Sequence, residues 1–346
     1  MANREADRVS QVPSSGTHGS KRAFSRPHPV PPPTMSYQDV DGDIVLIGAG
    51  TIGLSFAALH LQYVSPVKLK IVDPRPDLDF YVTETLPKFL PDCHKQLAWS
   101  LTLTSDLASA VQNASIVQEQ GPENAHFKKA IWEEVERHAP KNALFWSSTS
   151  GIPASVQNER MMDKSRLLVV HPYNPPHVMP LLELVKSPQT SEDLIQKTLA
   201  FWRRREREPV VIKEECTGFV ANRLAFALLR ESIQLVNEGV VTVEEVDKIV
   251  QSSMGPRWAV WGPFKSYHAG GGAGGLEGFF KNIGGTVQAC WDEGGKVNVG
   301  EGWEKQVFQQ AQEAYGVVDT EERDKVTRRV LEAVEEGKEI VADGWK

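Results

Sequence analysis

Short apolar runs alternate with segments of helical periodicity over the first two thirds of the chain. The runs Ile44–Ile47 and Leu69–Val72 have the length and continuity typical of strands buried in a parallel sheet. Between them, Leu54–Val64 carries apolar residues at helical spacing. The same alternation predicts further strands and helices at Leu101–Leu103, Leu107–Val111, Ser115–Glu119, Asn124–His138, Ala143–Ser147 and Leu167–Val170. A doubly wound α/β sheet of the Rossmann type that closes near Ile212 is therefore predicted.

Beyond that sheet the periodicity is only helical. Helices are expected over Thr217–Glu238 and over Val243–Ser253, the second opened by a capping box at Thr242. We therefore expect an α/β domain at residues 41–215 and an all-α C-terminal domain for substrate binding and dimerisation at residues 216–346.

Residues 1–40 are rich in Pro, Ser and basic residues and lack apolar periodicity, so a disordered N-terminal tail is expected. A mitochondrial transit peptide is an alternative, because basic residues outnumber acidic ones there. Because Met35 lies just before the expected fold, a gene model extended at its N-terminal end is a third possibility. Of these three interpretations we favour the disordered tail. We accordingly expect a cytoplasmic location rather than a mitochondrial one.

A glycine motif directly follows the first expected strand. Gly48, Gly50 and Gly53 have G-x-G-x-x-G spacing, which provides a tight turn, close backbone approach and helix–strand packing. The N–H groups at the start of the next helix, around Thr51 and Ile52, are expected to hold a pyrophosphate.

The second expected strand ends in Asp73, 20 residues after Gly53. A carboxylate there accepts hydrogen bonds from the adenine ribose and repels a 2′-phosphate, so NAD is expected in preference to NADP. Arg75 could receive a phosphate, but with Asp73 before it we interpret Arg75 as a solvated loop residue.

Composition narrows the functional classes further. A net charge of −7 offers no electrostatic footprint for nucleic acid. No apolar stretch approaches the ~18–20 residues of a membrane span. The three cysteines are far apart, which fits a reducing compartment and neither a disulfide framework nor a metal site. Neither nucleic acid nor a membrane is therefore expected as a partner.

Three polar residues follow strand ends, where ligands bind in open α/β sheets. Ser150 follows the strand that ends at Ser147, and His171 ends the next strand. Glu183 is a charge inside the apolar run Leu181–Val185, where burial is costly unless the carboxylate is paired. We expect Glu183 beside His171, with His171 as a general base.

These motifs resemble the 3-hydroxyacyl-CoA dehydrogenase superfamily over about residues 40–330. The matching stretches are the glycine loop, Glu119–Glu123, Ser148–Ser150, His171–Pro175, Leu182–Val185 and Thr217–Arg223. The resemblance implies an NAD-dependent dehydrogenase in which Glu123 and Lys128 contact the nicotinamide half of NAD. It also implies a homodimer paired through the C-terminal helices.

The same resemblance implies the roles of the catalytic residues. His171 matches the family's catalytic histidine and Glu183 its acidic partner. Ser150 and Asn222 match polar residues that hold the reacting oxygen, and Asn174 matches a substrate-side asparagine.

Within the superfamily, Met254–Pro263 resembles the λ-crystallin and L-gulonate 3-dehydrogenase branch. We expect Arg257 to bind the carboxylate of a small hydroxy acid through paired hydrogen bonds, although it could instead be a helix-end arginine. The expected reaction is NAD-dependent oxidation of the 3-hydroxyl of an L-gulonate-like acid. A 3-hydroxybutyryl-CoA dehydrogenase and a crystallin-like NAD-binding structural protein are the alternatives.

A homodimer is also expected from the first C-terminal helix, because a helix that is apolar all round must be buried on several sides. Its apolar positions are Phe219, Leu224, Phe226, Leu228, Leu229, Ile233 and Leu235.

Overall fold

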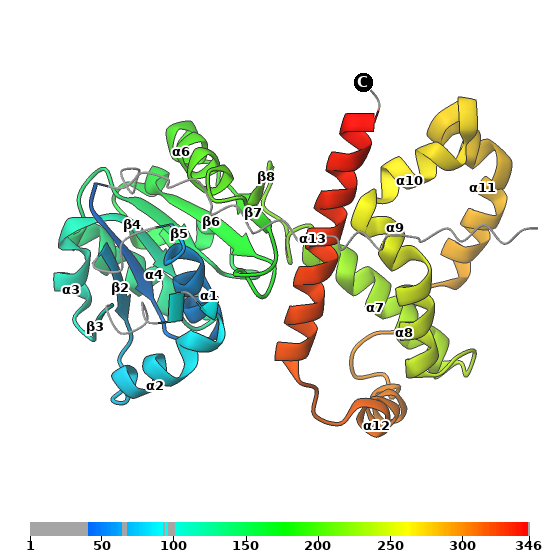
Figure 1. The fold of residues 1–346 in the computed structure, drawn as a ribbon, viewed down its shortest axis with the longest axis horizontal. Helices are drawn as coiled ribbons and strands as arrows, with labels where there is room; N and C mark the ends of the chain where they lie inside the picture. Colours follow the sequence, from blue (N-terminus) through cyan, green and yellow to red (C-terminus); the bar gives the residue numbers. More distant parts are fainter. Residues whose placement is uncertain (1–40, 64–67, 93, 96–100, 345–346) are drawn as a thin grey trace, which may run out of the picture. The chain divides into compact units, whose positions relative to one another are not determined.

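The computed structural model describes residues 41–63, 68–92, 94–95 and 101–344, so the expected N-terminal tail lies outside the described residues (Figure 1). Eight strands form one sheet in the order β3-β2-β1-β4-β5-β6-β7-β8. Their bounds are β1 Asp43–Ile47, β2 Leu69–Val72, β3 Thr102–Thr104, β4 Ala114–Glu119, β5 Leu144–Ser147, β6 Leu167–Pro172, β7 Leu181–Val185 and β8 Glu208–Ile212.

The helices fall into two groups along the chain. Those interspersed with the strands are α1 Thr51–His60, α2 Leu78–Thr85, α3 Leu107–Ala110, α4 Ala125–His138, α5 Ala154–Gln157 and α6 Glu192–Arg203. Those after the sheet are α7 Ala221–Asn237, α8 Val243–Ser252, α9 Met254–Val260, α10 Pro263–Gly270, α11 Gly275–Glu293, α12 Glu304–Tyr315 and α13 Thr320–Gly344. Short 3₁₀ turns occur at Leu86–Lys88, Val111–Asn113, Asn158–Arg160, Lys164–Arg166 and Gly272–Gly274.

Both faces of the sheet are buried at its centre. In β1, Ile44 and Leu46 join a core that includes α1 and α6, while Val45 and Ile47 join a second core that includes α4. A strand buried on both faces carries apolar side chains on each face, which is why the sequence of β1 is a continuous apolar run. The predicted fold class, a Rossmann-type sheet followed by an all-α region, is confirmed.

One strand pair breaks the parallel order. β6 and β7 run antiparallel, and their register places His171 directly opposite Glu183. β8 then pairs parallel with β7 and ends the sheet at Ile212, as the sequence predicts. The apolar run Leu181–Val185 is thus a buried strand, and it places Glu183 beside His171.

The first helix after the sheet starts later than expected. α7 begins at Ala221 because Gly218 and Phe219 adopt left-handed backbone conformations, with φ of 73° and 52°. The capping box at Thr242 forms as predicted. In the described part of the chain, no helix has the length and apolar character to cross a membrane. The same residues contain no group of His, Cys, Asp and Glu side chains suited to a metal ion.

Candidate active site

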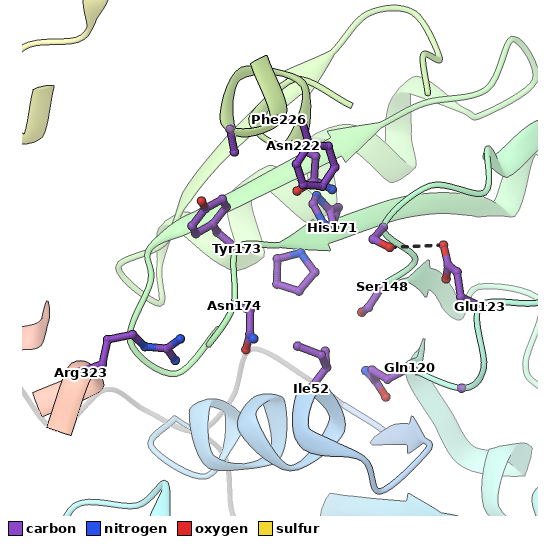
Figure 2. A pocket seen from close by; sticks show the side chains of 14 residues that line it. Ile52, Gln120, Glu123, Ser148, His171, Tyr173, Asn174, Asn222, Phe226 and Arg323 are labelled. Carbon is purple, nitrogen blue, oxygen red and sulfur yellow. Dashed lines mark hydrogen bonds between the residues drawn. The ribbon is translucent and has the colours of Figure 1, made fainter. Parts of the chain in front are cut away.

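A cleft of about 550 Å³ opens where β6 and the loop after β5 meet the start of α7 (Figure 2). Its volume suits a small molecule or part of a cofactor. The residues that line it are Ile52, Gln120, Gly121, Glu123, Ser148, Ser150, His171, Pro172, Tyr173, Asn174, Asn222, Ala225, Phe226 and Arg323. The structure therefore brings together Ser150, His171, Asn174 and Asn222, which the sequence proposed from separate motifs.

His171 and Glu183 form a buried pair at this cleft. The His171 Nδ1 atom lies 2.8 Å from Glu183 Oε2, and both side chains are almost fully covered. The Phe219 ring lies 5.2 Å from the imidazole, centroid to centroid, and is itself buried. Because Nδ1 is engaged by the carboxylate, Nε2 is the ring nitrogen left for a ligand in the cleft.

Glu183 also connects the histidine to helix α7. Its Oε1 atom accepts hydrogen bonds from the backbone N–H groups of Val220 and Ala221, at 2.8 and 3.0 Å. Burial by itself would raise the pKa of Glu183. The hydrogen bonds from His171 and from these two N–H groups outweigh burial and hold the pKa below its ordinary value. Glu183 is therefore a stable anion that orients the imidazole and the start of the helix that carries Asn222.

The glycine loop fits a dinucleotide phosphate. Gly48 has a φ of 106°, which favours glycine, and a Cβ on Gly53 would lie 1.9 Å from the Gly48 carbonyl oxygen. Gly50, just before α1, is exposed, and a Cβ there would meet no described atom within 4 Å apart from its chain neighbours. The open space at Gly50, ahead of Thr51 and the free N–H groups of α1, matches what a bound pyrophosphate requires.

Asp73 is positioned by this loop. Its Oδ2 accepts from the Ala49 N–H at 2.8 Å, and its Oδ1 accepts from the Arg75 N–H at 3.0 Å. The Arg75 guanidinium contacts Asp77 and lies 3.6 Å from the Tyr81 ring centroid, which agrees with our interpretation of Arg75 as a loop residue. Asp73 is thus held at the end of β2, where the ribose of a dinucleotide would lie.

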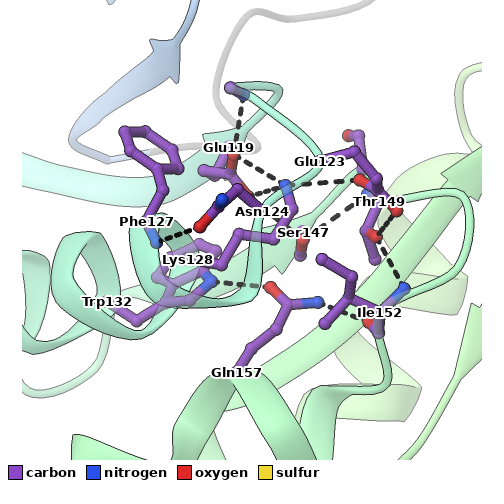
Figure 3. Close-up of polar contacts among 12 residues, drawn as sticks. Glu119, Glu123, Asn124, Phe127, Lys128, Trp132, Ser147, Thr149, Ile152 and Gln157 are labelled. Atoms are coloured by element: carbon purple, nitrogen blue, oxygen red, sulfur yellow. Dashed lines mark hydrogen bonds and ion pairs between the residues drawn. The ribbon is translucent and has the colours of Figure 1, made fainter.

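A buried ion pair supports the wall of the cleft (Figure 3). Lys128 Nζ lies 2.9 and 2.8 Å from the two carboxylate oxygens of Glu119, and both side chains are buried. Lys128 also lies 3.8 Å from Glu123, which accepts a 2.9 Å hydrogen bond from the Gly151 N–H. Glu123 lines the cleft as expected, but Lys128 does not. Lys128 lies behind Glu123, and its contact with the nicotinamide half of NAD stays a prediction.

Several lining residues were not found from the sequence. Ser148 accepts a hydrogen bond from Gln118 at 3.3 Å, and Tyr173 and Phe226 contribute aromatic surface. Ser148 and Tyr173 belong to the stretches Ser148–Ser150 and His171–Pro175, on which the family resemblance rests, so the sequence does point to these two residues. Arg323 had no such signal, because it lies on a helix of alternating charges.

The structure does not bring Arg257 to this cleft. Arg257 is exposed on α9, and Arg323 on α13 lines the cleft instead. The expectation that Arg257 binds the substrate carboxylate in its own chain is therefore not supported by the geometry. Its alternative interpretation, a helix-end arginine, agrees with its position in the short α9 helix.

The fold and the cleft together are those of a dinucleotide-dependent dehydrogenase. The family model for the NAD-binding domain of 3-hydroxyacyl-CoA dehydrogenase matches residues 43–216, and the model for the C-terminal domain of that enzyme matches residues 218–293. The chain belongs to the 3-hydroxyacyl-CoA dehydrogenase family, a family of NAD-dependent oxidoreductases.

Individual relatives agree with this assignment. An L-carnitine dehydrogenase of Oceanobacillus iheyensis is 36% identical over 192 residues, which cover 56% of this chain and 62% of that protein. A 3-hydroxyacyl-CoA dehydrogenase of Gibberella moniliformis is 34% identical over 247 residues, 69% of this chain and 76% of that protein. The solved 3-hydroxyacyl-CoA dehydrogenase of Archaeoglobus fulgidus has a TM-score of 0.61 at 26% identity, covering 85% of this chain and 99% of that one. Neither curated relative bears the name of the L-gulonate branch.

We expect NAD to be used at least roughly an order of magnitude better than NADP in kcat/KM, because the Asp73 carboxylate repels a 2′-phosphate. Asp73→Asn should narrow this preference, since an amide keeps an acceptor for the Ala49 N–H but loses the charge. Steady-state kinetics with both cofactors measure the ratio. Equal use of the two cofactors by the unaltered protein would remove Asp73 as the selecting group.

Proposed function

We propose that this protein catalyses the NAD-dependent oxidation of the 3-hydroxyl group of a small hydroxy acid. The observation that carries the proposal is the buried His171–Glu183 pair, which reaches the same cleft as Asn222 and Ser150. A free imidazole nitrogen suits removal of a hydroxyl proton near neutral pH. A crystallin-like structural role alone would not require this combination of polar groups.

In this mechanism, His171 Nε2 accepts the proton of the substrate hydroxyl as the carbonyl forms. Glu183 fixes the ring tautomer by accepting from Nδ1–H, and its charge stabilises the imidazolium. Asn222 and Ser150 hydrogen-bond the reacting oxygen, and Asn174 contacts the remainder of the substrate. Bound NAD⁺ supplies the acceptor for the hydride from the carbinol carbon.

Two observations favour particular hydroxy acids as the substrate. The resemblance of Met254–Pro263 favours an L-gulonate-like acid, whereas the name of the Oceanobacillus relative favours L-carnitine. Both are small 3-hydroxy acids with a free carboxylate. The second candidate function, oxidation of a 3-hydroxyacyl-CoA, is favoured by the name of the Gibberella relative.

The proposal is tested by following NADH formation with four substrates: L-gulonate, L-carnitine, L-3-hydroxybutyrate and L-3-hydroxybutyryl-CoA. We expect at least one free acid to be oxidised with a higher kcat/KM than the thioester. Efficient oxidation of the thioester with no turnover of any free acid would replace the proposal with the second candidate. Turnover of none of them would favour the structural role.

We also propose that the protein acts as a cytoplasmic homodimer paired through its C-terminal helices. Leu224, Leu228 and Leu229 on α7 are 62%, 36% and 52% exposed in the single chain. A groove of about 360 Å³ with largely apolar walls runs between α7, α8 and α12. Large apolar side chains gathered on one region mark an interaction surface.

The dimer should be disrupted by a charge on α7. We expect Leu229→Glu to halve the mass found by light scattering, because an unpaired carboxylate in an apolar interface is costly. Phe80→Glu is the matched control: Phe80 is also exposed, but on α2 of the α/β domain. A monomer mass for the unaltered protein at micromolar concentration would contradict the proposal.

A further inference from the structure

Arg323 is a cleft residue that neither the nucleotide loop nor the His171–Glu183 pair uses. It lies in the first turn of α13 and lines the cleft together with Tyr173 and Asn174 (Figure 2). Among the described residues that line this cleft, no other is a lysine or an arginine. The cleft thus presents one permanent positive charge to whatever binds in it.

The guanidinium of Arg323 is held in one orientation, but not all of its N–H donors are used. Its Nε and Nη2 atoms lie 2.8 and 2.6 Å from Asp324 Oδ1, and the side chain is half exposed. Within the described part of the chain, Nη1 makes no hydrogen bond or ion pair. Ion pairs this exposed contribute little to stability. Asp324 therefore orients the guanidinium and leaves the Nη1 donors, with the second Nη2 donor parallel to one of them, available for an anion.

The charges of the cleft are separated in space. In Figure 2, Arg323 and Glu123 lie on opposite sides of His171. Glu123 is engaged on its own side by the Gly151 N–H and by Lys128. A substrate whose hydroxyl lies at His171 would therefore place an anionic group toward Arg323 and away from Glu123.

A second observation places the start of α13 beside the loop between β6 and β7. His177, in this loop, has a pKa lowered to about 4, chiefly by burial; the charges of Arg328 and Arg207 also lower this pKa, and the charge of Asp324 raises it. The two α13 charges, those of Arg328 and Asp324, therefore lie close enough to His177 to influence it. The position of Arg323 near Tyr173 and Asn174 agrees with this placement of the helix.

We propose that Arg323 binds the carboxylate of the hydroxy acid and makes the site selective for free 3-hydroxy acids over their thioesters. This assignment rests on the proposed function. A carboxylate offers two charged oxygens to the parallel N–H donors of a guanidinium, whereas a thioester carbonyl is neutral and offers one oxygen. Arg323 is thus a specificity-determining residue that sets the substrate's orientation, while His171 performs the proton transfer.

The test is calorimetric titration of L-carnitine and L-3-hydroxybutyrate into the protein saturated with NADH, where no turnover occurs. Arg323→Met should raise the Kd of the acid by about 10- to 100-fold, the range of a lost charge-assisted hydrogen bond. The Kd of Arg323→Lys should lie between those of the unaltered protein and Arg323→Met, because lysine keeps the charge but lacks the paired N–H donors. The matched control is Arg329→Met, on the same helix but not lining the cleft. NADH affinity should be unchanged in all three variants.

Three results would overturn the assignment. The first is an unchanged Kd in Arg323→Met, and the second is no binding of either acid to the unaltered protein. The third is a raised Kd for L-3-hydroxybutyryl-CoA alone, which would mean that the arginine binds a CoA phosphate. Because the readout is binding, loss of acid affinity in Arg323→Met supports the assignment even if no acid is oxidised. In that case only the proposed function fails.

Discussion

Replacing His171 with alanine is expected to lower kcat by about 10²–10⁴-fold, the usual contribution of general acid–base catalysis. NADH should still bind with normal affinity, because the ring is held by Glu183 at the substrate side of the cleft and the glycine loop is untouched. Turnover kinetics and NADH fluorescence titration measure the two quantities separately. His126→Ala, on the exposed surface of α4, is the control and should change neither.

Glu183→Gln distinguishes a positioned base from a histidine that is merely nearby. A glutamine can still accept from the Val220 and Ala221 N–H groups through its oxygen. Its amide nitrogen would then donate to His171 Nδ1, which forces the proton of a neutral ring onto Nε2 and removes the base from the cleft. We expect a loss of kcat of about the same order as for His171→Ala. Near-normal turnover in His171→Ala would exclude His171 as the base, and near-normal turnover in Glu183→Gln would exclude Glu183 as the residue that positions it.

Gly53→Ala is expected to damage both the fold and cofactor binding. The new Cβ would lie 1.9 Å from the Gly48 carbonyl oxygen, a backbone atom that cannot move without opening the loop. Overpacking of this kind costs typically 1–3 kcal/mol and occasionally more. Thermal unfolding should show a clearly lower Tm, and NAD affinity should fall with it.

Gly50→Ala provides the matched comparison. Its φ of −70° is open to alanine, and the added Cβ meets empty space in the absence of ligand. The Tm should therefore stay close to that of the unaltered protein, while the Kd for NAD rises on the order of tenfold or more, because the methyl group blocks close approach of the pyrophosphate. Unchanged NAD affinity in Gly50→Ala would contradict the placement of the phosphate at this loop.

The pairing of His171 with Glu183 could be predicted from the sequence because its signal is local. A glutamate inside an apolar run must be buried and therefore paired, and His171 ends the preceding expected strand. What the sequence did not contain was the antiparallel register of β6 and β7 that sets the two residues opposite one another. The nucleotide loop could be predicted equally well, since Gly48 is required by its positive φ and Gly53 by its close approach to the Gly48 carbonyl oxygen.

The positions of Lys128 and Arg323 could not be predicted from local sequence patterns. Lys128 lies nine residues after Glu119, and only the packing of α4 against the end of β4 turns the two into a buried pair. Arg323 follows Asn222 by about a hundred residues on a helix whose charges alternate as on a solvated surface. Its place in the cleft depends on tertiary packing, which no short-range periodicity encodes. Arg257 was selected for its chemistry, but α9 leaves it outside the cleft.

The most direct test of the central claim is to incubate the protein with NAD⁺ and the preferred 3-hydroxy acid carrying deuterium at C3. Mass spectrometry of the reduced cofactor then reports the origin of the transferred hydrogen. The account predicts reduced cofactor that carries the deuterium, formed by the unaltered protein and at a greatly reduced rate by His171→Ala. Reduced cofactor without deuterium, or no reduced cofactor with any 3-hydroxy compound, would contradict it.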